Sequence, residues 1–105
     1  MTKGLTDIRA AKFAEIVKDV PINMPVTVSE AKMNTNEDYK EYSYYVSAYV
    51  FVSTLSSIHF IYYTNDDEKA DVAQGDTIKI QGLIKDFLFF SYLIDYLAFT
   101  VVDAE

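Results

Sequence analysis

A short run of alternating residues between two glycines constrains the fold of this chain most strongly. Residues 75–82 read GDTIKIQG, in which Ile78 and Ile80 alternate with polar side chains. This period of two is the pattern of a strand with one buried face. Gly75 permits the positive φ of a tight turn, and Gly82 interrupts the row of side chains, as at a bulge or at a corner where a strand bends around a barrel. The segment therefore predicts a curved strand in a mainly β protein.

A helix and four more strands are expected in the rest of the chain. Apolar residues recur at helical spacing over residues 6–19, which predicts an amphipathic helix with Thr6 or Asp7 as its N-cap. Pro21 and Pro25 then mark a break. Beyond them the period becomes two, and strands are expected in the segments VTVSEA, YSYYVSAYVFVST, SSIHFIYYT and YLIDYLAFTVVDA. The polar segment NDDEKADVA, between the third and fourth strands, is expected to be a loop or a short helical turn.

The composition is that of a globular, cysteine-free domain. The 105 residues suit one domain, 50% of them are apolar and none is cysteine, which excludes a disulfide scaffold and a thiolate metal site. The N-terminus lacks the apolar core of a signal peptide. The longest apolar stretch, residues 87–102, contains Asp95 and is shorter than the roughly 20 residues that cross a bilayer. We therefore expect a cytoplasmic protein without a membrane span.

The sequence offers no arrangement of residues for catalysis. Its one histidine, His59, lies within a strand pattern and has no visible acid–base or nucleophilic partner. The acidic segment 66–71 lacks the glycine and the spacing of a calcium loop, and the three glycines form no phosphate-binding loop. We expect neither an enzyme nor a cofactor or metal site.

The segment VAQGDTIKIQG, residues 72–82, resembles the fourth strand of OB-fold domains that bind single strands. In such domains this strand follows the pattern L-x-x-G-D-x-[VI]-x-[VI]-x-G, and Val72 occupies its leading apolar position here. The resemblance covers roughly residues 26–103 and looks most like small phage or plasmid single-strand-binding proteins. It implies a mainly β, five-stranded OB-fold-like Greek-key barrel with an N-terminal α-helix, within a single domain of residues 1–105.

The second expected strand separates small aliphatic side chains from rings. Its inward positions are expected to be Tyr44, Val46, Ala48, Val50 and Val52, most of which suit a narrow barrel interior. Tyr45, Tyr49 and Phe51 then face outward. In the third expected strand both faces are apolar and either parity is open, but we favour the parity that points Ile58 and Phe60 inward.

The outward side chains of these two strands are the candidate ligand site, because OB-folds bind ligands there. Aromatic rings stack on unpaired bases for about 1–3 kcal/mol each, and lysines are expected to flank the rings and meet phosphates. The predicted nucleic-acid-binding residues are Tyr45, Tyr49, Phe51, His59, Tyr63, Lys40 and Lys79. The predicted function is non-sequence-specific binding of single-stranded DNA, or RNA, in phage or plasmid replication or recombination, with self-association into a homo-oligomer.

The net charge of −7 opposes this function, because nucleic-acid affinity comes largely from positive charge near phosphates. Exposed rings are also typical of protein interfaces, and the N-terminal helix or a second subunit could cover them. The alternative is therefore an acidic OB-fold module that binds a protein, such as a phage-encoded inhibitor or an assembly component.

Overall fold

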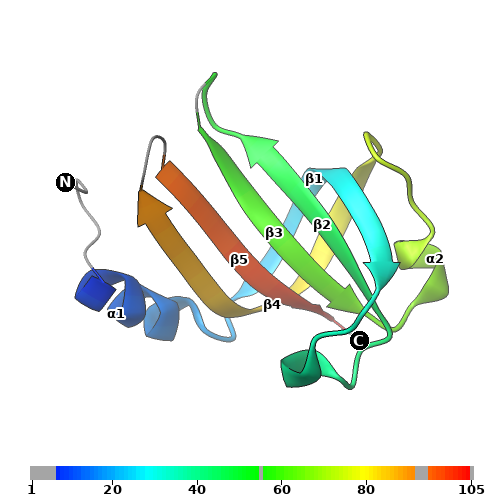
Figure 1. The fold of residues 1–105 in the computed structure, drawn as a ribbon, viewed down its shortest axis with the longest axis horizontal. Coiled ribbons are helices and arrows are strands. Elements are labelled where there is room, and N and C mark those ends of the chain that lie inside the picture. The colour runs from blue at the N-terminus through cyan, green and yellow to red at the C-terminus, as the bar shows by residue number, and fades with distance from the viewer. Residues whose placement is uncertain (1–6, 55, 92–94, 105) are drawn as a thin grey trace.

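Within residues 7–54, 56–91 and 95–104, which a computed structural model describes, five strands form one mixed sheet that closes in a ring after a short helix (Figure 1). The elements in chain order are α1 (Asp7–Val17), β1 (Pro21–Met33), the 3-10 helix η1 (Glu37–Tyr39), β2 (Tyr44–Phe51), β3 (Ser57–Thr64), α2 (Asp67–Ala70), β4 (Thr77–Ser91) and β5 (Asp95–Asp103). The expected order is confirmed: a helix, then five strands, with a short helix between the third and the fourth.

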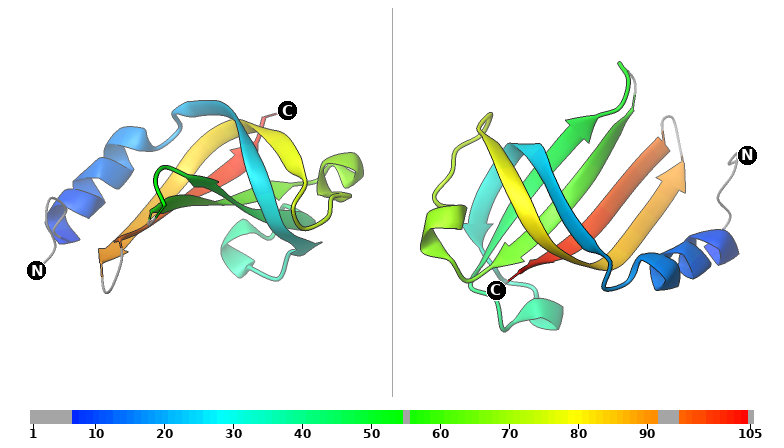
Figure 2. Two further views of the ribbon diagram at one scale, coloured as in Figure 1. Left: turned by 90° about the horizontal axis from the view of Figure 1, so that it is seen from above. Right: turned by 180° about the vertical axis from the view of Figure 1, so that it is seen from behind.

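The ring follows the order β1-β2-β3-β5-β4, and β4 returns to β1. Neighbouring strands are antiparallel except β3 and β5, which are parallel. β1 and β4 are long enough to change partners. Residues 21–27 of β1 pair with β4 and residues 27–33 with β2, while residues 77–83 of β4 pair with β1 and residues 82–91 with β5. Figure 2 shows how strongly both strands bend as they do so.

The core fills the ring with inward side chains from every strand. It consists of Val26, Val28, Val46, Ala48, Phe60, Tyr62, Ile80, Ile84 and Val101. The predicted parity of β2 is confirmed, because Val46 and Ala48 are 0% exposed. The parity favoured for β3 is confirmed too, since Phe60 is buried and Ile58 packs against the core. The prediction that Val52 faces inward is wrong, because it lies beyond the end of β2 and is 56% exposed.

Gly82 lies where β4 passes between its two partners. It pairs with Ile22 of β1 on one side and with Asp103 of β5 on the other. A Cβ atom on this residue would lie 1.9 Å from the backbone oxygen of Val102, so no side chain fits there. The expected strand corner is therefore a point of close backbone contact, and the strand continues through it. The turn expected before the strand is confirmed by Gly75, whose φ is +92°.

The break between helix and strand falls just before Pro21, which is the first residue of β1. Pro25 lies inside β1, so this strand begins earlier than the predicted strand at Val26. The two prolines pair with Leu83 and Lys79 of β4, in the part of β1 that β2 does not reach. Proline is tolerated at such an edge because its missing N–H can point away from the ladder. Pairing with β4 thus overrides the break that proline usually marks at Pro25.

The helix α1 packs against its own sheet, on β4. It ends at Val17, before the predicted end at Asp19, and Thr6 lies outside the described residues. The ring of Phe13 meets that of Phe87 edge-on, with centroids 4.8 Å apart. The helix lies behind β4 (Figure 2), so it leaves the front of β2 and β3 open.

Candidate nucleic-acid interface

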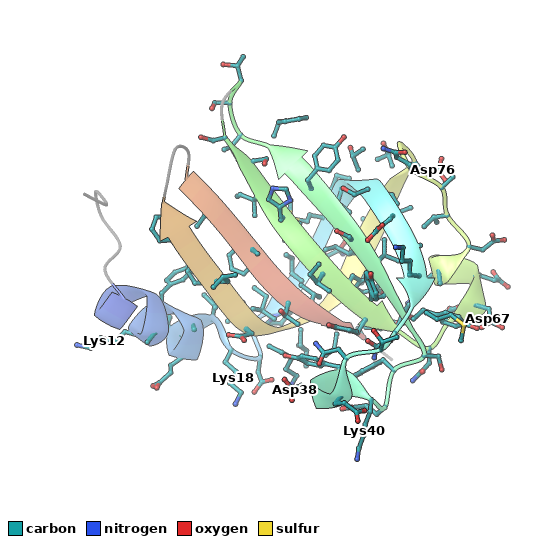
Figure 3. All side chains as sticks on the ribbon, viewed as in Figure 1. Lys12, Lys18, Asp38, Lys40, Asp67 and Asp76 are labelled. Atoms are coloured by element: carbon teal, nitrogen blue, oxygen red, sulfur yellow. The ribbon has the colours of Figure 1, made fainter. Side chains whose placement is uncertain are left out.

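The outward side chains of β2 and β3 form one surface at the front of the molecule (Figure 3). The two paired strands bring them side by side, as Tyr45 with Tyr63, Ser47 with Ile61, Tyr49 with His59, and Phe51 with Ser57. We call these residues the outer face. Neither strand contains an acidic residue. The outer face therefore combines rings and small polar groups without negative charge of its own.

Two rings stand at one end of the outer face. Tyr49 and Phe51 contact each other edge-on, with centroids 5.1 Å apart. Phe51 is 68% exposed and Tyr49 is half-buried. Exposed apolar surface that gathers in one place marks interaction sites more often than scattered residues do. Among the residues that the structure describes, this pair is the clearest indication of a binding surface.

His59 lies beside Tyr49, on the neighbouring strand. Its Nε2 is 3.0 Å from Ser57 Oγ, and burial lowers the pKa of the imidazole. The ring is therefore mostly neutral at neutral pH. His59 takes its predicted position on the outer face, where it adds a flat polar surface rather than a positive charge.

Tyr63 faces outward as predicted, but its ring is not open to a ligand, because it is only 5% exposed. Tyr39 of η1 stacks on it, with centroids 4.5 Å apart and planes 12° from parallel. The side-chain amide of Asn36 donates a hydrogen bond to its hydroxyl over 3.0 Å. The segment between β1 and β2 therefore covers the end of the outer face that lies away from Phe51.

Two asparagines hold this covering segment in place. The side-chain amide of Asn34 donates to the carbonyl oxygens of Tyr39 and Tyr42, over 2.8 and 3.0 Å. The side-chain oxygen of Asn36 accepts from the backbone N–H of Asp38 and caps η1. The sequence predicts a polar loop here, and its local pattern does not show which ring the loop covers.

The two predicted lysines do not flank the outer face. Lys79 lies on β4 opposite Pro25 of β1, and β1 separates it from β2 in the ring. Lys40 follows η1 and points away from the sheet (Figure 3). Lys32 lies closer, because it pairs with Tyr45 at the edge of the outer face. The side of β1 on which Lys32 lies cannot be predicted by alternation, because the alternation of inward and outward residues shifts within this strand.

A β-bulge in β1 causes this shift, and it places Glu30 beside the outer face. By strict alternation from Val28, which faces the core, Glu30 would point inward. The pairing with β2 shifts between these two residues, so Glu30 pairs with the outward Ser47, and Ala31 packs toward the core instead. The sequence does not predict this place for Glu30. The only sign of the bulge in the sequence is that the alternation of apolar and polar residues ends at this point.

A hollow of about 250 Å³ lies between Glu30 and the outer face. It is lined by Glu30, Asn34, Thr35, Asn36, Tyr45, Ser47, Ile61 and Tyr63. The Tyr45 hydroxyl donates to one Glu30 carboxylate oxygen over 3.4 Å, and Lys32 Nζ is 3.5 Å from the other. Both distances are long for polar contacts. The carboxylate is therefore held loosely at the rim of the hollow.

A second carboxylate, at the end of β5, serves the fold. Asp103 accepts hydrogen bonds from Tyr62 over 2.5 Å, from Thr64 over 2.7 Å and from Lys69 over 2.6 Å. Burial alone would raise its pKa, but these hydrogen bonds, that of Lys69 foremost, lower it below its usual value. They connect α2, which carries Lys69, to the ends of β3 and β5.

Comparison with known proteins does not identify a ligand for this surface. No protein-family model, curated protein or solved structure matches this chain. Among the described residues, no group of His, Cys, Asp and Glu side chains is arranged to hold a metal ion. No helix in this part of the chain is long and apolar enough to cross a membrane. The outer face itself is therefore the feature that points to a function.

Proposed function

We propose that this chain is an OB-fold protein that binds single-stranded nucleic acid, DNA above all, on its outer face. The fold supports the proposal, because OB-folds are five-stranded Greek-key barrels that bind oligonucleotides on strands 2 and 3. The order β1-β2-β3-β5-β4 fits that description. The observation that carries the proposal is the exposed pair Tyr49 and Phe51, on a face whose two strands contain no carboxylate.

Stacking of unpaired bases would supply most of the affinity. Phe51 offers an exposed ring, Tyr49 supports that ring edge-on, and Tyr45 lies further along the same strand. Each stack of a base on a ring contributes about 1–3 kcal/mol and tolerates any base. Tyr63 takes no part in this scheme while Tyr39 covers it.

Electrostatic attraction would contribute less than in most nucleic-acid-binding proteins. The labelled acids Asp38, Asp67 and Asp76 lie at the rims of the molecule rather than over β2 and β3 (Figure 3). Lys32, at the edge of the outer face, is the lysine best placed to meet a phosphate. The proposal therefore implies moderate affinity with a gentle dependence on salt. Self-association, which stays a prediction, would raise the affinity by offering several outer faces to one strand.

Titration of a labelled oligo-dT at low and at moderate salt tests the proposal. Phe51→Ala should weaken binding about tenfold, the loss of one stack, and should leave the fold intact because the ring is exposed. Ile16→Ala is the matched control, since Ile16 is 72% exposed but lies on α1. It should bind as the unmodified protein does. If the unmodified protein does not bind even at low salt, the proposal is wrong.

One observation favours a protein ligand instead. The chain beyond β2 exposes Val52, and a hollow of about 570 Å³ at this tip is lined by Phe51, Val52, Ser53 and Thr54. An apolar tip suits a protein interface, and the net charge of −7 suits a basic partner. If oligo-dT fails to bind, an acidic interaction module is the better interpretation of the same face.

A further inference from the structure

We propose that Glu30 and the hollow beside it read one base of the bound strand and select a base with an exocyclic amino group, cytosine over thymine. This inference rests on the proposed function. It adds one position of preference to a face that otherwise binds by unspecific stacking.

The hollow has the size of a single base. Its volume of about 250 Å³ equals that of about eight water molecules in the liquid, which gives room for one flat heterocycle. Tyr45, Ile61 and Tyr63 line it on the sheet side. Ser47 also lines it, and this residue is the next outward position along β2 from Tyr49. A strand stacked on the pair Tyr49 and Phe51 would therefore present its next base to the hollow.

Glu30 is the charged residue among those that line the hollow, so it decides which base edge fits there. An ionised carboxylate only accepts hydrogen bonds. Cytosine carries an amino donor at N4, whereas thymine carries a carbonyl acceptor at O4 in the equivalent position. In an unpaired strand the carboxylate would accept a hydrogen bond from the N4 amino group of cytosine, whereas thymine offers only an N3–H that lies between two carbonyl oxygens, and these repel the carboxylate.

The carboxylate of Glu30 has capacity for a new hydrogen bond. Its contacts with Tyr45 and Lys32, at 3.4 and 3.5 Å, are long, and an exposed ion pair of this kind is worth little. A carboxylate offers about four lone-pair positions. The amides of Asn34 and Asn36 are already engaged within their own segment and with Tyr63. They compete poorly for the base.

The test compares the dissociation constants of oligo-dC and oligo-dT of equal length, at a mildly alkaline pH that keeps oligo-dC single-stranded. The unmodified protein should bind oligo-dC about fivefold more tightly, which corresponds to one net hydrogen bond at a solvated site. Glu30→Gln keeps the shape of the side chain but allows it to donate as well as accept. This variant should lose the preference, mainly because it binds oligo-dT more tightly.

Glu68→Gln on α2 is the matched control, because it removes the same charge away from the outer face. It should leave the ratio of the two constants unchanged. Equal affinity of the unmodified protein for both oligonucleotides would overturn the inference. So would an equal gain for both in Glu30→Gln, which would mean that Glu30 only repels phosphates. In these two cases oligonucleotides still bind and the proposed function stands, whereas no binding of either oligonucleotide would overturn both.

Discussion

At the scale of the residue, the fold depends most on a position without a side chain. Gly82 lies where β4 changes partners, between Ile22 and Asp103. A Cβ there would meet the backbone oxygen of Val102 at 1.9 Å, and backbone atoms cannot yield unless a strand moves. Gly75 needs glycine for another reason: its φ is +92°, but the space around it is open.

These two glycines should respond differently to alanine. Gly82→Ala must displace β4 or β5 and should lower the free energy of unfolding by about 3 kcal/mol, or prevent folding. Gly75→Ala only strains its own backbone and should cost about 1–2 kcal/mol. Urea unfolding of both variants measures the two losses. Equal losses would mean that the strands can separate at Gly82 at little cost.

At the scale of the element, side-chain contacts attach the short helical pieces to the sheet. The attachments are Phe13 of α1 on Phe87, Tyr39 of η1 on Tyr63, and Lys69 of α2 on Asp103. The first two are contacts between rings that carry no charge at neutral or acidic pH, so acid does not weaken them. The third joins opposite charges, and its carboxylate is largely buried.

The ion pair that attaches α2 should make the free energy of unfolding depend on pH. Burial raises the pKa of Asp103, but the hydrogen bonds from Lys69, Tyr62 and Thr64 outweigh it, so the folded pKa is lowered. Its unfolded pKa is about 3.9. The stabilisation is therefore complete above that pH and is lost as the pH falls through the folded pKa, because the unfolded chain binds the proton first.

Asp103→Asn should remove this dependence. At neutral pH the variant should be less stable than the unmodified protein by about 2 kcal/mol, the worth of hydrogen bonds to a charged group. On acidification below the unfolded pKa it should lose less stability. Urea midpoints at neutral and acidic pH measure both effects, and parallel profiles for the two proteins would assign the acid sensitivity to other carboxylates.

How far these elements could be predicted depends on the range of the interactions behind them. Alternation is a local pattern, and it correctly predicts that Val46 faces the core and that Tyr49 faces outward. The start of β1 at Pro21 depends on pairing with β4, and alternation places this start too late. The bulge before Glu30 depends on pairing with β2, and alternation does not predict it. The burial of Tyr63 depends on η1, a segment from elsewhere in the chain, so the strand pattern around Tyr63 does not contain it.

At the scale of the whole molecule, the labelled acids are separated from the outer face, although Glu30 lies beside it. The outer face lies at the front of the molecule, and α1 lies behind β4 (Figure 2). The labelled acids lie at the rims (Figure 3). A chain with a net charge of −7 can therefore present a face without carboxylates from its two strands. The lysines are divided as well, with Lys32 at the edge of this face and Lys79 across the ring from β3.

This separation should be visible in the salt dependence of oligo-dT binding. Each phosphate contact contributes about 0.7 to the slope of log affinity against log salt for a single strand, so Lys32→Gln should reduce the slope by about 0.7. Lys79→Gln makes the same change of charge on β4, opposite Pro25, and should leave the slope unchanged. A reduced slope in Lys79→Gln alone would place the nucleic acid on the other side of the ring.

The last described strand, β5, lies between β3 and β4, so the ring can close only after β5 has been synthesised. Until then β3 has β2 on one side and an unpaired edge on the other. Closure that joins distant parts of a chain is slow, and an open strand edge on a nascent chain can pair with a neighbouring molecule. We therefore expect the protein to be prone to aggregation during translation, in the interval before its last described strand leaves the ribosome.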